Sequence, residues 1–376
     1  MKRIAIIGAG IGGLTTAIAL QKKGFEVEVF ETTPAFKKAG SGINLAMNAM
    51  QVYKRLGVYD DIIKNANHTV AMNSTTKKLK VLATVNFKKS ENIYGVKNVA
   101  IHRATLHEVL VNHVGTTPIH LDKKLTSLTQ SDDEVTLQFH DGTKFSTDIV
   151  IGADGINSAV RKSIFNTSEL RDANQVCWRG ISNAKINKKY KEELNEVWGR
   201  GSRFGFVHIS DNQIYWYALI NKDNYTGKNT DLVKLFSDYD PTIFQIIKET
   251  PQKDILFNEI WDLKPIDTWY KGNVCLMGDA AHATTPNMGQ GAVQAVESAM
   301  ALSLCLSEED SIAKAFSRYQ SIRKPKANYI VNTSWKIGKI AQTSNPVLTF
   351  LRDLIMLIVP ASVTEKQNKR VFDLNF

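Results

Sequence analysis

The glycine-rich segment Gly8-Ala9-Gly10-Ile11-Gly12-Gly13 constrains the fold of this chain more than any other feature. It follows a short apolar run at residues 4–8 and opens residues 11–23, whose apolar spacing predicts a helix. A second strand is predicted from Glu26 to Phe30, and it ends at Glu31. This order of strand, glycine turn, helix and strand is typical of a dinucleotide-binding βαβ unit.

The residue types in this unit fit an ADP moiety. The glycines permit a tight turn and let backbone N–H groups approach a pyrophosphate, and the helix N-terminus adds its partial positive charge. Glu31 can accept a hydrogen bond from a ribose hydroxyl, and an acid at this position argues against a 2′-phosphate. We therefore predict FAD or NAD, rather than NADP, as the tightly held dinucleotide. The motif alone leaves both open.

Later segments distinguish the two cofactors. Residues 152–161 read Gly-Ala-Asp-Gly-Ile-Asn-Ser-Ala-Val-Arg after an apolar strand, and residues 278–292 contain Gly-Asp-Ala-Ala-His followed by Pro286 and Gly-Gln-Gly-Ala. With Ile-His-Arg-Ala-Thr-Leu at 101–106, these motifs resemble those of the class A FAD-dependent aromatic hydroxylases. The resemblance covers essentially residues 1–340. It is nearest to the branch that contains urate, salicylate and 6-hydroxynicotinate hydroxylases and tetracycline-inactivating monooxygenases.

The motifs and the resemblance together predict a set of FAD-binding residues, whereas no residue is assigned a catalytic role and no metal is expected. These FAD-binding residues are Gly8, Gly10, Gly12, Gly13, Glu31, Ser41, Gly42, Arg103, Leu125, Asp154, Arg161, Gly278, Asp279, Pro286, Gly289, Gln290, Gly291 and Ala292.

The resemblance also implies individual roles. Asp154 and Arg161 would hold the loop where the FAD pyrophosphate and the reducing nicotinamide cofactor approach. A structural alternative is that Asp154 caps a helix beginning near Ser158 and pairs with Arg161. Asp279 would contact the ribityl or ribose hydroxyls, and His282 is interpreted as a structural hydrogen-bonding residue.

The remaining FAD contacts follow the same resemblance. Gly289 and Gly291 would let a helix N-terminus present backbone amides near the N1–C2=O end of the flavin. Arg103 would reach FAD from the start of a helix, and Leu125 would place a backbone group against the adenine. Gly40, Ser41 and Gly42 would lie near the flavin ring, with a plain loop as the alternative.

Substrate recognition is assigned to Arg179, Arg203, Tyr215 and Tyr217, because aromatic faces with one or two arginines suit a planar, anionic ligand. Alternatively, the tyrosines are core side chains and Arg203 is a turn charge. By resemblance, NADH or NADPH reduces FAD, a C4a-hydroperoxyflavin forms with O2, and one oxygen atom passes to a small aromatic or heteroaromatic substrate. The alternatives are an oxidase, halogenase or reductase on the same scaffold, or a non-catalytic FAD-binding protein.

The predicted fold is α/β, with a Rossmann-like FAD-binding domain interleaved with a mixed or antiparallel β-sheet domain and followed by C-terminal helices. Residues 1–75, 100–174 and 266–345 are assigned to the FAD-binding domain, 76–99 and 175–265 to the substrate-binding sheet, and 346–376 to a helical tail. In this tail, residues 346–360 form an apolar helix predicted to pack over the substrate cavity. Peripheral membrane contact is the alternative, disfavoured by the lack of a Lys/Arg cluster on its polar face.

Charge and cysteine usage bound the partners and the compartment. The formal net charge is +10, but the excess is spread along the chain, so no nucleic-acid partner is predicted. The three cysteines are far apart, which indicates neither disulfides nor a zinc site. No apolar stretch reaches the ~20 residues of a membrane span. We expect a cytoplasmic monomer or homodimer.

Overall fold

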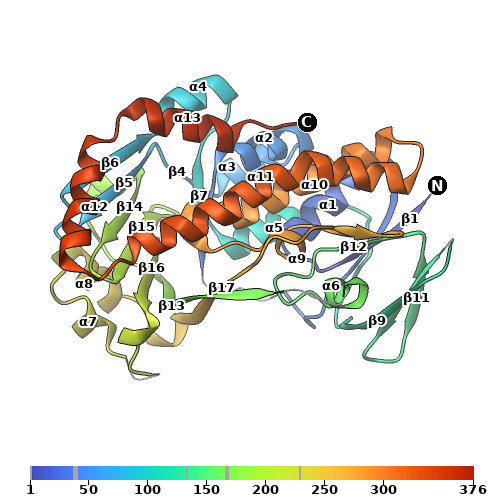
Figure 1. The fold of residues 1–376 in the computed structure, drawn as a ribbon, viewed down its shortest axis with the longest axis horizontal. Coiled ribbons are helices and arrows are strands. Elements are labelled where there is room, and N and C mark those ends of the chain that lie inside the picture. The colour runs from blue at the N-terminus through green and yellow to red at the C-terminus, as the bar shows by residue number, and fades with distance from the viewer. Residues whose placement is uncertain (1, 37–40, 133, 166–168, 228–229) are drawn as a thin grey trace.

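The computed structural model describes residues 2–36, 41–132, 134–165, 169–227 and 230–376. Two large sheets organise these residues, and the helix α11 (Ile312–Ala341) runs across the molecule from one to the other (Figure 1). The predicted α/β class, with a Rossmann-like sheet and a second mixed sheet, is confirmed.

The first sheet is six-stranded and built on the predicted βαβ unit. Its order is β18-β19-β12-β1-β2-β8, with β1 at Arg3–Ile7, β2 at Glu26–Phe30, β8 at Ile119–His120, β12 at Ile149–Gly152, β18 at Tyr270–Lys271 and β19 at Val274–Leu276. β1 pairs in parallel with β2 and β12, and β12 with β19. The three glycine-containing motifs therefore leave the sheet at the same edge, because they follow the carboxyl ends of neighbouring parallel strands.

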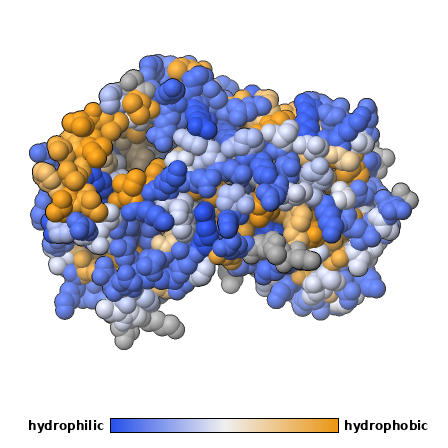
Figure 2. Space-filling view, in the orientation of Figure 1, coloured by the Kyte–Doolittle hydropathy of each residue, from blue (hydrophilic) through white to orange (hydrophobic). Residues whose placement is uncertain are grey.

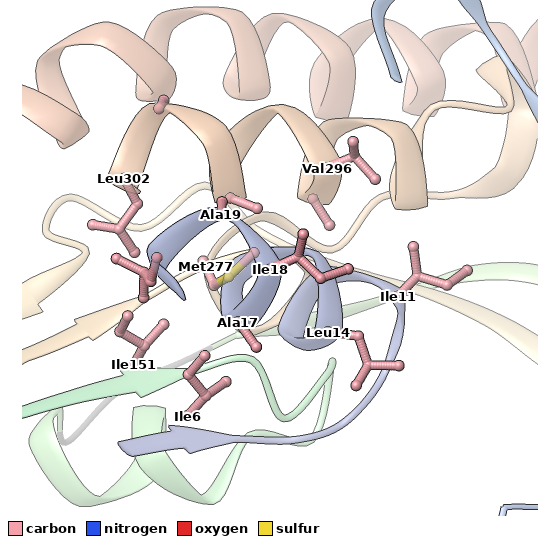
Figure 3. Close-up of a cluster of buried hydrophobic side chains, with 14 of the residues drawn as sticks. Ile6, Ile11, Leu14, Ala17, Ile18, Ala19, Ile151, Met277, Val296 and Leu302 are labelled. Atoms are coloured by element: carbon pink, nitrogen blue, oxygen red, sulfur yellow. The ribbon is translucent and has the colours of Figure 1, made fainter. Parts of the chain in front are cut away.

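Two helices pack in succession on this sheet. α1 (Ile11–Gln21) lies between the strands and α10 (Gly291–Glu308), as Figure 3 shows: Ile6 and Ile151 approach it from the sheet and Val296 and Leu302 from α10. All these side chains are buried. Close packing needs a small residue at the crossing, and Gly12 supplies it, since an added Cβ would lie 3.1 Å from the Cβ of Ala295.

The second large sheet is seven-stranded. Its order is β17-β13-β16-β15-β14-β5-β6, with β5 at Ala71–Thr76, β6 at Val81–Asn86, β13 at Leu170–Ser182, β14 at Glu193–Trp198, β15 at Ser202–His208, β16 at Ile214–Asn221 and β17 at Leu256–Leu263. Every pair is antiparallel except β14 with β5. The predicted boundaries at 75/76 and 174/175 fall inside β5 and β13, and the domain division stays a prediction.

Smaller sheets and helices complete the fold. One three-stranded sheet holds β3 (Gly42–Leu45), β7 (Val99–His102) and β4 (Asn67–His68), and another holds β11 (Lys144–Thr147), β10 (Val135–Phe139) and β9 (Leu125–Gln130). The other helices are α2 (Met47–Leu56), α3 (Tyr59–Lys64), α4 (Lys88–Tyr94), α5 (Arg103–His113), α6 (Ala159–Ile164), α7 (Leu232–Leu235), α8 (Pro241–Lys248), α9 (Asp279–His282), α12 (Pro346–Ile358), α13 (Ala361–Phe372) and the 3₁₀ turns η1 (Lys188–Tyr190), η2 (Lys222–Asn224), η3 (Gln252–Asp254) and η4 (Pro286–Met288).

The C-terminal helices leave one sheet and return to the other. α12 packs against the edge strand β6, and α13 leads back to α2, where the Gln51 side-chain amide donates to the Phe372 carbonyl at 3.0 Å (Figure 1). α13 therefore returns toward the first sheet, in the direction opposite to α11.

Candidate dinucleotide and substrate site

The glycines of the turn after β1 have different structural roles. Gly8 has φ +106°, and a Cβ there would lie 2.5 Å from the Ala153 carbonyl oxygen, so the first two motifs touch through their backbones. A Cβ on Gly13 would lie 1.9 Å from the Gly8 carbonyl oxygen, which makes glycine necessary for seating α1 on β1. A Cβ on Gly10 would meet no atom within 4 Å, so the space beside this residue is open.

This open space lies at a helix end that can hold an anion. α1 has no side-chain cap, so its first N–H groups are not satisfied by a capping side chain. Glu31 flanks them: its carboxylate accepts from the Ala9 N–H at 2.8 Å and from the Thr33 N–H at 2.9 Å. Free N–H groups, a cradle next to Gly10 and an adjacent carboxylate fit a pyrophosphate and a ribose.

The Asp154 loop is held as a cap, but Arg161 acts elsewhere. The Asp154 carboxylate accepts from the Ser158 hydroxyl at 2.5 Å and from the Val160 N–H at 3.0 Å, which fixes the start of α6. The predicted pairing of Arg161 with Asp154 is wrong: its guanidinium donates to the carbonyls of Ala280 at 2.9 Å and Ile156 at 2.5 Å. Arg161 is buried against α9, so it satisfies main-chain carbonyls and joins the second motif to the third.

The third motif ends in a second uncapped helix. Gly289 has φ +61° and ends η4, and α10 then begins without a side-chain cap on its first N–H groups. A Cβ on Gly291 would lie 4.0 Å from an Asp279 carboxylate oxygen, so Asp279 stands beside this N-terminus. α10 is 18 residues long, and its free N–H groups favour negative charge at this end.

The first residue of α5 brings a cation to the same place. The Arg103 N–H donates to the Ser41 carbonyl at 2.8 Å, and Gly42 pairs with His102 across β3 and β7. Burial lowers the pKa of Arg103, and the charge of Asp279 opposes this shift. Burial likewise raises the pKa of Asp279, opposed by the charge of Arg103.

Arg103 and Asp279 both reach solvent although protein surrounds them. Each side chain is exposed to water, yet desolvation is the largest influence on each pKa. Both groups are thus accessible to solvent but largely enclosed by protein, and we call this place the recess. The part of the chain that the structure describes gives the Asp279 carboxylate no hydrogen-bond donor, so a ligand hydroxyl can take that place.

Tyr215 closes this recess from the seven-stranded sheet. Its ring lies against Gly42, where an added Cβ would be 2.4 Å from the tyrosine Cβ. Burial raises its pKa, and the charges of Arg179 and Arg103 oppose that rise. Arg179 donates to the Asn258 side-chain oxygen at 2.5 Å. Tyr215 and Arg179 therefore stand at the recess, as predicted substrate residues would.

Arg203 and Tyr217 belong to a buried polar cluster instead. The Glu196 carboxylate accepts from the Tyr217 hydroxyl at 3.0 Å and from Arg203 at 3.3 Å, and Trp198 donates to its other oxygen at 2.8 Å. Arg203 also donates to the Asn287 side-chain oxygen at 2.6 Å and is 1% exposed. The alternative of a surface turn charge is wrong, because Arg203 links β15 to η4.

Several residues of this site have no motif in the sequence. Glu196 and Asn287 position Arg203, and a Cβ on Gly205 would lie 2.0 Å from the Tyr217 ring, so this glycine makes room for the tyrosine. The sequence offered one signal for Glu196, which is an acidic residue within a segment whose alternating pattern predicts a strand. The cross-strand register that sets Gly205 opposite Tyr217 is a tertiary property.

The structure also places the remaining predicted residues and His282. Leu125 is buried at the start of β9, and Lys123 donates its N–H to the Glu31 carbonyl at 2.8 Å. His282 is buried and hydrogen-bonded to Ser298 at 3.1 Å, and burial lowers its pKa to about 3, so its imidazole is neutral at physiological pH. Gly278, Pro286, Gln290 and Ala292 lie in the third motif, and Gly40 lies outside the described residues.

Comparison with known proteins gives a consistent picture. Residues 1–334 match a family model described as FAD binding domain (FAD_binding_3). The chain is 33% identical to the aurachin C monooxygenase/isomerase of Stigmatella aurantiaca, covering 98% of this chain and 97% of that protein. It is 28% identical to the 2-heptyl-3-hydroxy-4(1H)-quinolone synthase of Pseudomonas aeruginosa, covering 98% and 97%.

A solved structure shares the fold. The crystal structure of Klebsiella pneumoniae HpxO complexed with FAD and uric acid superposes with a TM-score of 0.90 at 24% identity, covering 99% of this chain and 96% of that one. The resemblance to flavin-dependent hydroxylases that the motifs indicated is therefore confirmed, as is FAD as the cofactor.

Proposed function

Since the chain belongs to the FAD-binding domain family of FAD-dependent monooxygenases, we propose that it uses NADH or NADPH and O2 to hydroxylate a small heteroaromatic ring. One observation carries the proposal. The uncapped N-terminus of α10 lies beside the carboxylate of Asp279, whose charge acts on Arg103, and Tyr215 of the second sheet lies near the same arginine. The uncapped N-terminus of α1 lies at the edge of the first sheet from which the Asp279 motif also leaves. This arrangement joins a dinucleotide site to an aromatic-lined site.

The chain's own residues bind, orient and exclude water. The N–H groups of α1 and the carboxylate of Glu31 would hold the pyrophosphate and ribose, and Asp279 would accept from a sugar hydroxyl. The N-terminus of α10 would stabilise negative charge on the isoalloxazine ring. FAD, when bound, supplies the hydride acceptor and the site of O2 activation.

The residues from the seven-stranded sheet would orient the ring of the substrate. Burial raises the pKa of both Tyr215 and Tyr217, so these phenols stay protonated at physiological pH and act as hydrogen-bond donors. Tyr217 already donates to Glu196, which leaves Tyr215 and Arg179 as the groups that face a ligand. An aromatic hydroxyl or ring carbonyl held by these donors would be positioned for oxygen transfer.

The names of two relatives narrow the substrate class. One is a 2-heptyl-3-hydroxy-4(1H)-quinolone synthase and the other an aurachin C monooxygenase/isomerase. At 28–33% identity over nearly the whole chain, these support a heteroaromatic ring, and a 4-quinolone with an alkyl chain heads the candidates. Hydroxypyridines, purines and aromatic acids complete the panel.

The test is oxidation of NADH and of NADPH by the purified flavoprotein with each member of this panel, with product masses recorded. We expect one ring class to stimulate oxidation and to yield a product heavier by one oxygen atom. Stimulated oxidation with no oxygenated product would instead establish an oxidase. No response to any ring class, despite bound FAD, would favour a non-catalytic FAD-binding protein.

Asp279→Ala is expected to purify largely without yellow flavin. The carboxylate supports no hydrogen bond within the described protein, so its loss removes a ligand contact and leaves folding intact. FAD affinity should fall about tenfold to a hundredfold, measured by titration of the apoprotein. Asp223→Ala, at an exposed site in η2, is the matched control. Normal flavin content in Asp279→Ala would contradict the assignment of Asp279 as an FAD-binding residue.

Arg203→Ala is expected to weaken substrate binding about tenfold or more while the protein keeps its flavin. The change leaves Glu196 with one donor fewer and releases Asn287, so the substrate-facing strands lose their connection to η4. Because Arg203 acts through these partners, Arg203→Lys should restore part of the affinity. Arg200→Ala, in the exposed turn nearby, should change nothing. An unchanged substrate affinity in Arg203→Ala would contradict the role of Arg203 in positioning the substrate-facing strands.

A further inference from the structure

The outer side of α12 is apolar and uncovered. Figure 2 shows apolar residues gathered over α12, beside a hollow in this face of the molecule. We call the following residues the apolar face, with exposures between 45% and 70%: Leu348, Phe350, Leu351, Leu354, Ile355 and Ile358. At 3.6 residues per turn they occupy about half of the helix circumference.

The polar side of the same helix faces the protein. Thr349 and Arg352 are buried, and Arg352 donates to the carbonyls of Gly199 at 3.2 Å and Ala341 at 3.1 Å and to Asp353 at 2.9 Å. This is the reverse of a helix that covers a core. The packing of this helix over the substrate cavity stays a prediction. The inward contacts are made by its polar side, through Thr349 and Arg352.

Such an orientation has a cost in water. Large apolar side chains left exposed forgo the favourable free energy of burial, and contiguous apolar patches of this kind mark interaction sites. All residues of α12 are described, and the apolar face itself carries no charged and no hydrogen-bonding side chain. A partner for this face must therefore be apolar and must need no directional bonds.

Exposed cations precede and follow the apolar face in the chain, and another borders the strand on which α12 packs. Residues 336–376 contain six lysines and arginines against three acids. Lys339 precedes α12 and Lys366 follows it, both exposed, and exposed Lys80 borders β6, on which α12 packs. Each of the three acids is paired within the protein, Asp353 with Arg352, Glu365 with Lys89, and Asp373 with Lys369. With more cations than acids, this segment is net positive, and we call its exposed cations, together with Lys80, the rim.

The length of α12 determines how it could meet a bilayer. Its 13 residues extend about 20 Å, less than the ~30 Å hydrocarbon core. Within the described residues no single helix is long and apolar enough to cross a membrane, and α12 passes such a test only together with residues 363–372, across an 86° bend. A helix with one apolar side flanked by cations fits an orientation parallel to the membrane, in the plane of the membrane–water interface.

We propose that the apolar face of α12 docks on the surface of an anionic lipid bilayer, with the helix parallel to the membrane and the cations of the rim against lipid headgroups. A second copy of this chain is the competing occupant. It would bring one net-positive rim against another, whereas anionic headgroups complement the rim. The charge around the face thus favours lipid.

Flotation of the purified holoenzyme with vesicles tests the proposal. We expect it to float with phosphatidylcholine–phosphatidylglycerol vesicles, less with pure phosphatidylcholine, and less at high salt. The triple variant Phe350→Ser/Leu354→Ser/Ile358→Ser should lose more than about a hundredfold in vesicle partitioning. All three side chains point outward, so flavin content should be normal. Ile358→Asp alone is the milder second variant.

Phe244→Ser, an exposed apolar residue on α8, is the matched control and should float like the unaltered protein. Failure of the unaltered holoenzyme to float with any vesicle would overturn the proposal, as would flotation that the triple variant retains. Sedimentation velocity tests the competing occupant. If the unaltered protein is a dimer that binds no vesicles, and the triple variant is a monomer, the apolar face would be assigned to a second copy instead.

Discussion

Replacing Glu297 by alanine is expected to lower the free energy of unfolding by about 3–5 kcal/mol, the usual cost of removing one partner from a buried ion pair. Glu297 is fully buried on α10 and accepts from Arg323 at 2.6 Å and from Lys326 at 2.9 Å, both on α11. Asn48 of α2 and Gln294 also donate to it. Without the carboxylate, two buried cations lose their counter-charge, so urea unfolding should shift to much lower concentration.

The exposed pair of Glu365 with Lys89 gives the control for this prediction. Both side chains are more than half exposed, so Glu365→Ala should produce little change in unfolding. The same buried network reaches Gln290, whose side-chain oxygen accepts from Asn48 and Gln294 at the start of α10. Equal unfolding curves for Glu297→Ala and Glu365→Ala would contradict the role of this network in joining α2, α10 and α11.

Gly10→Ala is expected to fold normally and to lose FAD, whereas Gly13→Ala is expected not to fold stably. A Cβ on Gly10 meets no protein atom within 4 Å, so unfolding of the apoprotein should change by less than about 1 kcal/mol. The same Cβ would fill the space assigned to the pyrophosphate, and FAD affinity should fall by more than about a hundredfold. A Cβ on Gly13 would instead lie 1.9 Å from a backbone oxygen, a clash expected to cost more than about 3 kcal/mol.

Titration of the Gly10→Ala apoprotein with FAD and urea unfolding of both variants provide the measurements. Gly24→Ala separates the two effects further: it has φ +80° and open space, so it should be modestly destabilised and should bind FAD normally. Full FAD occupancy in Gly10→Ala would place the pyrophosphate elsewhere and contradict the geometry of the α1 site.

Local motifs explain why the first sheet and its cofactor site could be predicted. The turn at Gly8, the cap at Asp154 and the glycines around α10 each impose a backbone conformation that a few neighbouring residues determine. The hydrogen-bond partner of Arg161 could not be predicted, for the same reason in reverse. Its partner, the Ala280 carbonyl, is 119 residues away in the chain and becomes a neighbour only when the two loops pack.

The substrate side was less accessible to sequence reasoning. Alternation along β16 places Tyr215 and Tyr217 on one face of the strand. Tyr215 nevertheless lines the recess and Tyr217 donates to Glu196, because neighbouring strands place different partners beside them. The apolar period of α12 predicted a helix and the side on which Arg352 lies. It did not determine which side faces the protein, since that depends on the carbonyls of Gly199 and Ala341.

Incorporation of isotopically labelled O2 tests the central claim most directly. The purified protein, carrying FAD, is incubated with oxygen-18-labelled O2, NADH or NADPH, and the heteroaromatic compound that stimulates oxidation of the nicotinamide cofactor. The product is analysed by mass spectrometry. The account predicts a product that contains one labelled oxygen atom, with one nicotinamide cofactor oxidised per product molecule. A product without label, or one labelled only from heavy water, would contradict a flavin-dependent monooxygenase.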